Sequence, residues 1–97
     1  MAKIYEIVEK ATKTGKVERG INEVTKALER GLAKVVIIAK DVNPKEIVQH
    51  IPILAKEKNI KVLEVDSKEK LGISSGISVG TSAVAIIKEG EADLSAL

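Results

Sequence analysis

The sequence predicts an α/β protein, a three-layer α/β/α sandwich with a mixed, mostly buried sheet of about four strands. Short runs of Val, Ile and Ala alternate with helical segments of roughly 10 to 15 residues, which is typical of a sheet covered by helices on both faces. The apolar runs cover residues 34–39, 61–65 and 81–87, and a shorter extended piece covers 17–19. The chain of 97 residues has no internal linker, so we expect one domain, 1–97.

Two helices are predicted in the first third of the chain. Residues 3–14 have apolar side chains at helical spacing, and the helix is expected to end before Gly15. Asn22 belongs to a residue type favoured at helix N-caps, and we expect it to open a second helix that ends at Gly31.

Two further helices are predicted in the remainder of the chain. The sequence NPKE at 43–46 combines a capping residue, a proline at the first helical position and a glutamate three residues after the cap. It predicts a helix that runs to about residue 59, and Pro52 is expected to bend this helix or to weaken one of its turns. Ser67 is expected to cap a short fourth helix that ends before Gly76, and the segment from Gly90 onward is expected to be frayed.

The composition excludes several kinds of site. There is no cysteine and only one histidine, His50, which excludes disulfides, thiol catalysis and zinc ribbons. With no second metal ligand in view, we expect His50 to be structural, and we expect no metal and no cofactor. The single aromatic residue, Tyr5, argues against surfaces that stack bases on aromatic rings. No segment approaches the roughly 20 apolar residues that cross a bilayer and no signal peptide is recognisable, so we expect a cytoplasmic protein without a membrane partner.

The residues with most potential for binding lie in the segment 16–30, KVERGINEVTKALER. Gly20 allows a tight turn or a close approach of the backbone to a ligand, and the helix that follows begins with unpaired amides, which favour an anion. Glu23, Lys26 and Arg30 share one face of this helix, at i, i+3 and i+7. Taken alone, the pattern favours an ordinary surface helix in which Glu23 pairs with the two basic residues in solvent.

The same segment closely resembles the archaeal L-seven-Ae family of kink-turn-binding ribosomal proteins. The resemblance begins with GINEVTKALERG at 20–31 and the strand that follows, and it continues in order along nearly the whole chain. The further matches are DVNP at 41–44, EIV at 46–48, HIP at 50–52, EKN at 57–59, SK at 67–68, LG at 71–72 and GI at 76–77. The resemblance implies a protein that is not an enzyme and that binds kink-turns, which are sharply bent RNA elements built on sheared G·A pairs.

The resemblance also implies partners and a location. Family members act in translation as ribosomal large-subunit proteins, and they are shared components of guide-RNA ribonucleoproteins. We therefore expect a ribosomal location in the cytoplasm and a structured RNA partner, either ribosomal RNA or guide RNA, together with ribonucleoprotein core proteins. No small-molecule substrate is expected.

Roles for individual residues follow from the same resemblance. The resemblance implies that Glu23 accepts a hydrogen bond from a guanine, while Asn22 and Lys26 donate hydrogen bonds to its O6 or N7. Positions that approach the sugar-phosphate backbone are matched by Arg19, Gly20 and Lys68. Positions near the protruding nucleotide of the bend are matched by Asn43 and Ile47. The backbone contacts set the register of the RNA, and the Asn, Glu and Lys trio sets the specificity.

The other half of the implied site is the loop before the last strand, residues 76–81. It contains Ile77, Ser78 and Val79, and the resemblance implies that the two apolar side chains support flipped-out bases. The alternative is a glycine-flanked turn in which Ile77 and Val79 reach the core. A phosphate-binding P-loop is a poor match, because GISSGISVG at 72–80 lacks the GK[ST] ending.

Some positions depart from the pattern of the archaeal proteins: Glu18, Ile21, Ile73 and Gly80. Glu18 and Ile73, together with a C-terminal end shorter than that of typical members, favour an alternative, a diverged or engineered protein of the same fold that acts as a protein-interaction module or stability scaffold with weak or no RNA binding. A small-molecule-binding or enzymatic α/β domain is a third alternative, and the lack of catalytic side chains disfavours it. The paired carboxylates at 64 and 66 are predicted to face solvent at a strand end.

Overall fold

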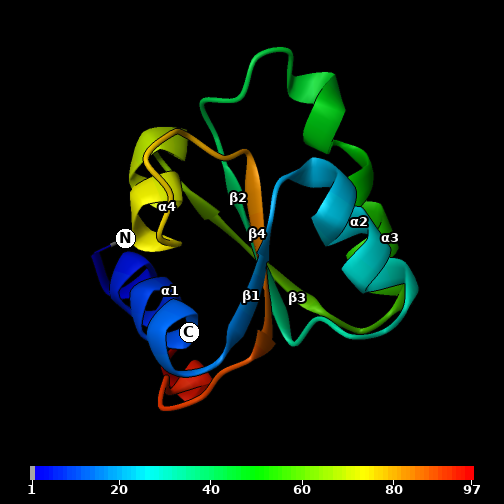
Figure 1. Cartoon of the computed structure of the whole chain (residues 1–97). Coiled ribbons are helices and arrows are strands. Elements are labelled where there is room, and N and C mark those ends of the chain that lie inside the picture. Colours follow the sequence, from blue (N-terminus) through cyan, green and yellow to red (C-terminus); the bar gives the residue numbers. More distant parts are fainter. Residues whose placement is uncertain (1) are drawn as a thin grey trace.

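A single mixed sheet of four strands runs through the molecule (Figure 1). The computed structural model describes residues 2–97. The strands are β1 (Lys16–Arg19), β2 (Val35–Ala39), β3 (Lys61–Val65) and β4 (Ala83–Lys88), each within two residues of its predicted run. They lie in the order β1-β4-β2-β3. Strand β4 pairs antiparallel with β1 and with β2, whereas β2 and β3 are parallel, so the predicted mixed sheet is confirmed.

Helices cover both faces of the sheet, as predicted (Figure 1). One face carries α1 (Ala2–Thr14) and α4 (Lys68–Ser74), and the other carries α2 (Ile21–Glu29) and α3 (His50–Glu57). Alternate side chains of β2 supply the two cores, because successive side chains of a strand point to opposite faces. Val35 and Ile37 belong to one core, and Val36 and Ile38 belong to the other. Within residues 2–97, no helix has the length and apolar composition of a membrane span.

Helix α2 begins earlier than the sequence predicted. Its N-cap is Gly20 rather than Asn22, and no side chain caps it. Gly20 has φ 89°, a conformation that glycine adopts without strain, so the chain turns directly from β1 into the helix. Asn22 therefore lies inside the first turn, and its side chain has no capping function.

The helix predicted from 43 to about 59 is divided into two parts. Residues Lys45–Val48 form a 3₁₀ helix, η1, and α3 starts only at His50. Neither part has a side-chain capping bond, so the predicted cap at Asn43 is wrong. Pro52 is the third residue of α3, where an N–H would have no intrahelical partner, and the helix continues through it without interruption.

The segment after β4 is packed, so the prediction of a frayed end from Gly90 onward is wrong. Ala92 is buried in the core beneath α1, and Leu94–Ala96 form a short 3₁₀ helix, η2. The amide of Glu91 donates to Oγ1 of Thr14 (2.8 Å), which ties the segment to the end of α1.

Tyr5 links α1 to the connection between β3 and α4. Its hydroxyl donates to Oδ1 of Asp66 and accepts from the amide of Ser67 (3.2 Å). Ser67 caps α4, as predicted, by accepting from the amide of Lys70 (3.1 Å). Burial and the bond to Asp66 raise the pKa of Tyr5, and the same bond lowers the pKa of Asp66. Asp66 and Glu64 are exposed near the strand end, as predicted, but Asp66 is held by the tyrosine.

Tyr5→Phe is expected to lower the thermal midpoint by a few degrees at neutral pH, because it removes these hydrogen bonds. The lowered pKa of Asp66 means that its contribution is present at neutral pH and is lost as the pH falls through that pKa. The raised pKa of Tyr5 means that its contribution is lost as the pH rises through that pKa. Thermal denaturation of both proteins across the pH range measures the difference, and a difference that stays constant at both extremes contradicts the prediction.

Candidate nucleic-acid interface

Three turns meet at one edge of the sheet, the upper edge in Figure 1: those that follow β1 and β2, and the one that precedes β4. The amide of Gly20 donates to the carbonyl of Ala83 (2.9 Å), and the amide of Ala39 donates to the carbonyl of Ser82 (3.0 Å). These bonds keep the turns side by side, because β4 lies between β1 and β2. The residues that the sequence singles out lie on or next to these turns.

The opening of α2 presents three polar side chains to solvent. Asn22, Glu23 and Lys26 are exposed, and the last two have 52% and 54% of their side-chain surface accessible. Lys26 Nζ lies 3.5 Å from Oε1 of Glu23, a loose ion pair that contributes little in solvent. The first intrahelical hydrogen bond is donated by Val24, so the amides of residues 21–23 point out of the helix end. A carboxylate acceptor, two donor side chains and free amides therefore lie within the opening turns of α2.

A hollow of about 120 Å³ lies between α2 and β1. Glu23, Lys26 and Arg30 share one of its walls, which confirms the predicted common face of the helix. Lys16 and Glu18 of β1 form part of the opposite wall, so both signs of charge are present.

Arg19, at the end of β1, connects this strand to the end of α4. Its Nε donates to the carbonyl of Ser75, a fully buried residue. A Cβ at Gly76 would lie 3.7 Å from a terminal nitrogen of Arg19, so the guanidinium lies against the start of the loop before β4. The sequence suggested only a contact with the RNA backbone at this position. In the structure, Arg19 also holds the end of α4 against β1. This function could not be predicted from the sequence, because Arg19 and Ser75 are 56 residues apart in the chain.

The loop before β4 turns its side chains in different directions. Val79 is 66% exposed and Ser78 is exposed, whereas Ile77 is half-buried. The alternative in which both apolar residues reach the core is therefore wrong for Val79. This side chain presents apolar surface to solvent and is available to a ligand.

The same loop rests on α4 through a glycine. A Cβ at Gly72 would lie 1.9 Å from the carbonyl oxygen of Val79, so only glycine allows this close approach. The amide of Ile77 donates to the carbonyl of Gly72 (3.1 Å), and the amide of Thr81 donates to the carbonyl of Lys68 (3.0 Å). The role of Gly72 was not predicted from the sequence, although a glycine inside a predicted helix is a signal of close packing.

The turn after β2 reaches the opening of α4. Oδ1 of Asp41 accepts a hydrogen bond from the amide of Lys68 (2.8 Å), a contact that the sequence analysis missed. The Lys68 side chain is exposed, and a Cβ at Gly80 would lie 3.2 Å from its Cγ. Asn43 is exposed and Ile47 is 40% exposed. Lys68 therefore lies beside the loop before β4, and Asp41 links it to the segment that carries Asn43 and Ile47.

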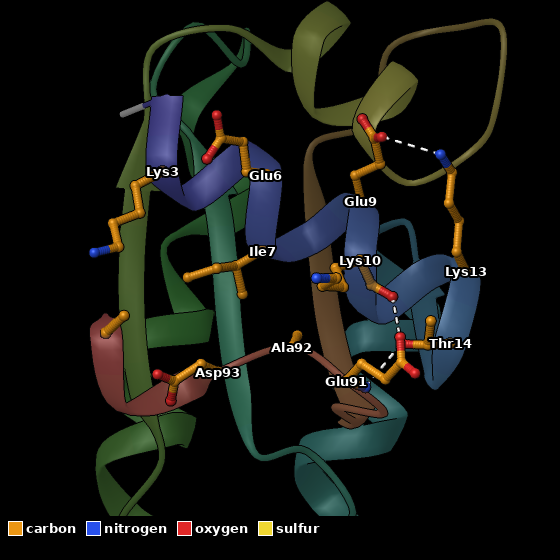
Figure 2. Close-up of a pocket in the computed structure, with 11 residues that line it drawn as sticks. Lys3, Glu6, Ile7, Glu9, Lys10, Lys13, Thr14, Glu91, Ala92 and Asp93 are labelled. Atoms are coloured by element: carbon orange, nitrogen blue, oxygen red, sulfur yellow. Dashed lines mark hydrogen bonds and ion pairs between the residues drawn. The ribbon is translucent and has the colours of Figure 1, made fainter.

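A larger hollow, of about 520 Å³, lies between α1 and the segment after β4 (Figure 2). Figure 2 shows Lys13 paired with Glu9 along α1, at 3.1 Å, and Glu91 next to Thr14. The walls carry side chains of both charges. None of the candidate RNA-binding residues lines this hollow, so it forms no part of the candidate interface.

Comparisons with known proteins agree with this architecture. The model of the Ribosomal protein L7Ae/L30e/S12e/Gadd45 family matches residues 2–95. Among solved structures, the 15.5kD RNA binding protein of Giardia lamblia is similar, with a TM-score of 0.85 and 34% sequence identity. The similarity covers 95% of this chain and 74% of that chain.

The descriptions of this family and of this structure are those of ribosomal and RNA-binding proteins, which agrees with the prediction that the chain is not an enzyme. The matched region extends over all four strands and all four helices. This chain therefore belongs to the Ribosomal protein L7Ae/L30e/S12e/Gadd45 family.

Proposed function

We propose that this protein binds RNA and recognises kink-turns through the exposed edge of a sheared G·A pair. The observation that carries the proposal is the opening of α2, where Asn22, Glu23 and Lys26 are exposed and only loosely paired. The similarity to the Giardia RNA binding protein supports the RNA-binding part of the proposal.

The chemistry of the trio fits the purine edge that a sheared pair leaves open. In such a pair the guanine uses its sugar edge, so its N1–H, O6 and N7 face the groove. The carboxylate of Glu23 accepts from a guanine N–H, and the Asn22 amide and Lys26 ammonium donate to O6 or N7. A duplex with Watson–Crick pairs does not present this combination, because N1 and O6 are then used in pairing.

The surrounding residues are proposed to hold the RNA on either side of this pair. We propose that Gly20, Arg19 and Lys68 approach phosphate groups, which set register rather than specificity. Asn43 and Ile47 lie beside the position proposed for the protruding nucleotide. The exposed Ser78 and Val79 and the half-buried Ile77 are proposed to provide an apolar and hydroxyl surface for unstacked bases, which suits a protein without Phe or Trp.

The proposed mechanism is the selection of one RNA conformer. Free kink-turn RNA samples open and bent forms, and a protein that fits only the bent form shifts the population by its differential affinity. The partners proposed are ribosomal RNA or a guide RNA, in the ribosome or in a ribonucleoprotein particle that holds other core proteins.

A fluorescence anisotropy titration of a labelled kink-turn RNA tests the proposal. We expect binding at moderate salt that weakens as salt rises, with a linear dependence of log affinity on log salt concentration. Absence of binding even at low salt refutes the proposal and selects a protein-interaction scaffold. The acidic Glu18 beside Glu23 and Lys26, and the 68% exposed apolar side chain of Ile73 in α4, are the features that favour that second function.

Lys68→Ala is expected to lower the affinity for the kink-turn RNA and for a control RNA without G·A pairs to the same degree. The reason is that an ammonium group that contacts a phosphate does not distinguish between bases. The slope of log affinity against log salt is expected to fall by about one. Lys58→Ala removes the same charge and is the matched control, because Lys58 is exposed at the end of α3, just before β3, and the parallel strands β2 and β3 therefore place it at the opposite edge of the sheet from the turn after β2. A loss confined to the kink-turn RNA, or an equal loss in both variants, contradicts the phosphate contact.

A further inference from the structure

A side-chain hydrogen bond joins α2 to the first residue of α3. Nε2 of His50 lies 2.8 Å from Oγ1 of Thr25, which is half-buried and directly precedes Lys26 in the chain. The hydroxyl of Thr25 also bonds the carbonyl of Ile21, at 2.7 Å. The two helices lie side by side on the same face of the sheet (Figure 1). The bond therefore connects two helices through residues that are 25 positions apart in the chain.

The geometry determines which atom donates. The hydroxyl of Thr25 has a single proton, which is directed to the carbonyl of Ile21, a group that can only accept. Oγ1 therefore accepts from His50, whose Nε2 carries a proton.

The segment that precedes α3 has few other restraints. Two backbone hydrogen bonds at the ends of η1 are long, at 3.4 Å each, and η1 and α3 have no side-chain caps. Within residues 2–97, the side chains of 43–49 make no hydrogen bond to the rest of the fold, and that of His50 is the next along the chain to make one. Asp41 and the buried Val42 anchor the start of the segment, and Val48 is buried near its end, where the bond of His50 is the side-chain hydrogen bond that follows.

We infer that Thr25 and His50 are positioning residues for RNA recognition, an inference that rests on the proposed function. Their bond holds the segment with Asn43 and Ile47 at a fixed place relative to the opening of α2. Neither residue needs to touch RNA. Without the bond, the segment must become ordered when a kink-turn binds, and this entropic cost lowers the affinity. The affinity for an RNA that contacts only the basic side chains does not change when the bond is lost.

Thr25→Val tests the inference because it removes the acceptor and keeps the shape of the side chain. Thr12→Val is the matched control: Thr12 is half-buried in α1 and donates to the carbonyl of Val8 at the same 2.7 Å, without a histidine partner. We expect Thr25→Val to bind kink-turn RNA about three- to tenfold more weakly than Thr12→Val. Thr25→Ser restores the acceptor and is expected to restore the affinity, and a control RNA without G·A pairs is expected to bind all variants equally.

Hydrogen exchange in the free protein supplies a measurement that does not depend on RNA. The amides of residues 45–49 are expected to exchange faster in Thr25→Val than in Thr12→Val. Unchanged exchange, or an affinity loss no greater than that of Thr12→Val, overturns the inference while the preference of the wild type for kink-turn RNA stands. A wild-type protein that binds both RNAs equally refutes the proposed function itself, and the recognition role of the two residues with it.

Discussion

Gly72→Ala is expected to lower the free energy of unfolding by about 3 kcal/mol, because the added methyl group has no space between α4 and the loop before β4. The new Cβ would lie 1.9 Å from the carbonyl oxygen of Val79, a backbone atom that moves only if the loop moves. The sign of the change is informative. Gly→Ala at an open position inside a helix stabilises by roughly 0.5–1 kcal/mol, so helix propensity and steric conflict predict opposite results. Urea unfolding followed by circular dichroism measures the change.

Gly80→Ala is the matched control for this substitution, because it adds the same methyl group on the loop side of the contact between α4 and the loop before β4. The Cβ at Gly80 would lie 3.2 Å from Cγ of Lys68, an exposed and flexible side chain that can move away. We expect its effect to remain below about 1 kcal/mol. A stabilising effect of Gly72→Ala, or equal effects in the two variants, would show that the loop does not depend on its close contact with α4.

Glu23→Ala is expected to weaken binding to a kink-turn RNA by about 1–3 kcal/mol, roughly 5- to 150-fold, because the guanine N–H then loses its acceptor. The stability of the protein is expected to change little, since the ion pair with Lys26 is long and exposed. Isothermal titration calorimetry with the kink-turn RNA and with a control RNA without G·A pairs measures the effect on each.

Glu29→Ala separates recognition from charge. Glu29 is an exposed residue at the end of α2, and its replacement removes the same single negative charge as Glu23→Ala. If attraction of the polyanion governs affinity, both variants bind RNA more tightly than the wild type. The proposal predicts weaker binding for Glu23→Ala and unchanged or slightly tighter binding for Glu29→Ala. Equal behaviour of the two variants contradicts base recognition by Glu23.

The layers of the fold could be predicted from local patterns. The β-branched run at 34–39 marks a strand with both faces covered, and β2 is in fact buried along its whole length. The Ser67 cap was also predictable, because its side chain bonds an amide only three residues away. These features depend on neighbouring residues in the chain, which is the information that a single sequence contains.

The errors arose where contacts distant in the sequence override local preference. Asn22 has the propensity of an N-cap, but the bond from Gly20 to Ala83 and the positive φ of Gly20 start the helix earlier. The segment from Gly90 onward has no helical periodicity, yet Ala92 is buried against the core and Thr14 bonds the neighbouring amide. Such contacts join residues that the sequence does not place together.

The candidate site shows the same division. The common face of Glu23 and Lys26 follows from helix geometry, and their exposure matches the expectation. The contacts that hold the site in place could not be predicted from helix geometry. The bond from Arg19 to Ser75 joins residues 56 positions apart, and the bond between Thr25 and His50 joins residues 25 positions apart. The sequence therefore indicated which residues are available for recognition, whereas the structure identifies the contacts that position them.

The most direct test of the account is a titration of the wild-type protein with two RNAs that differ only at the G·A pairs. One is a kink-turn, and the other has Watson–Crick pairs at the same positions. Both have the same length and nearly the same phosphate charge, so their electrostatic attraction to the protein is alike. Recognition of the sheared pair predicts clearly tighter binding to the kink-turn at moderate salt. Equal affinity for the two RNAs would contradict the recognition of a sheared purine edge by the opening of α2.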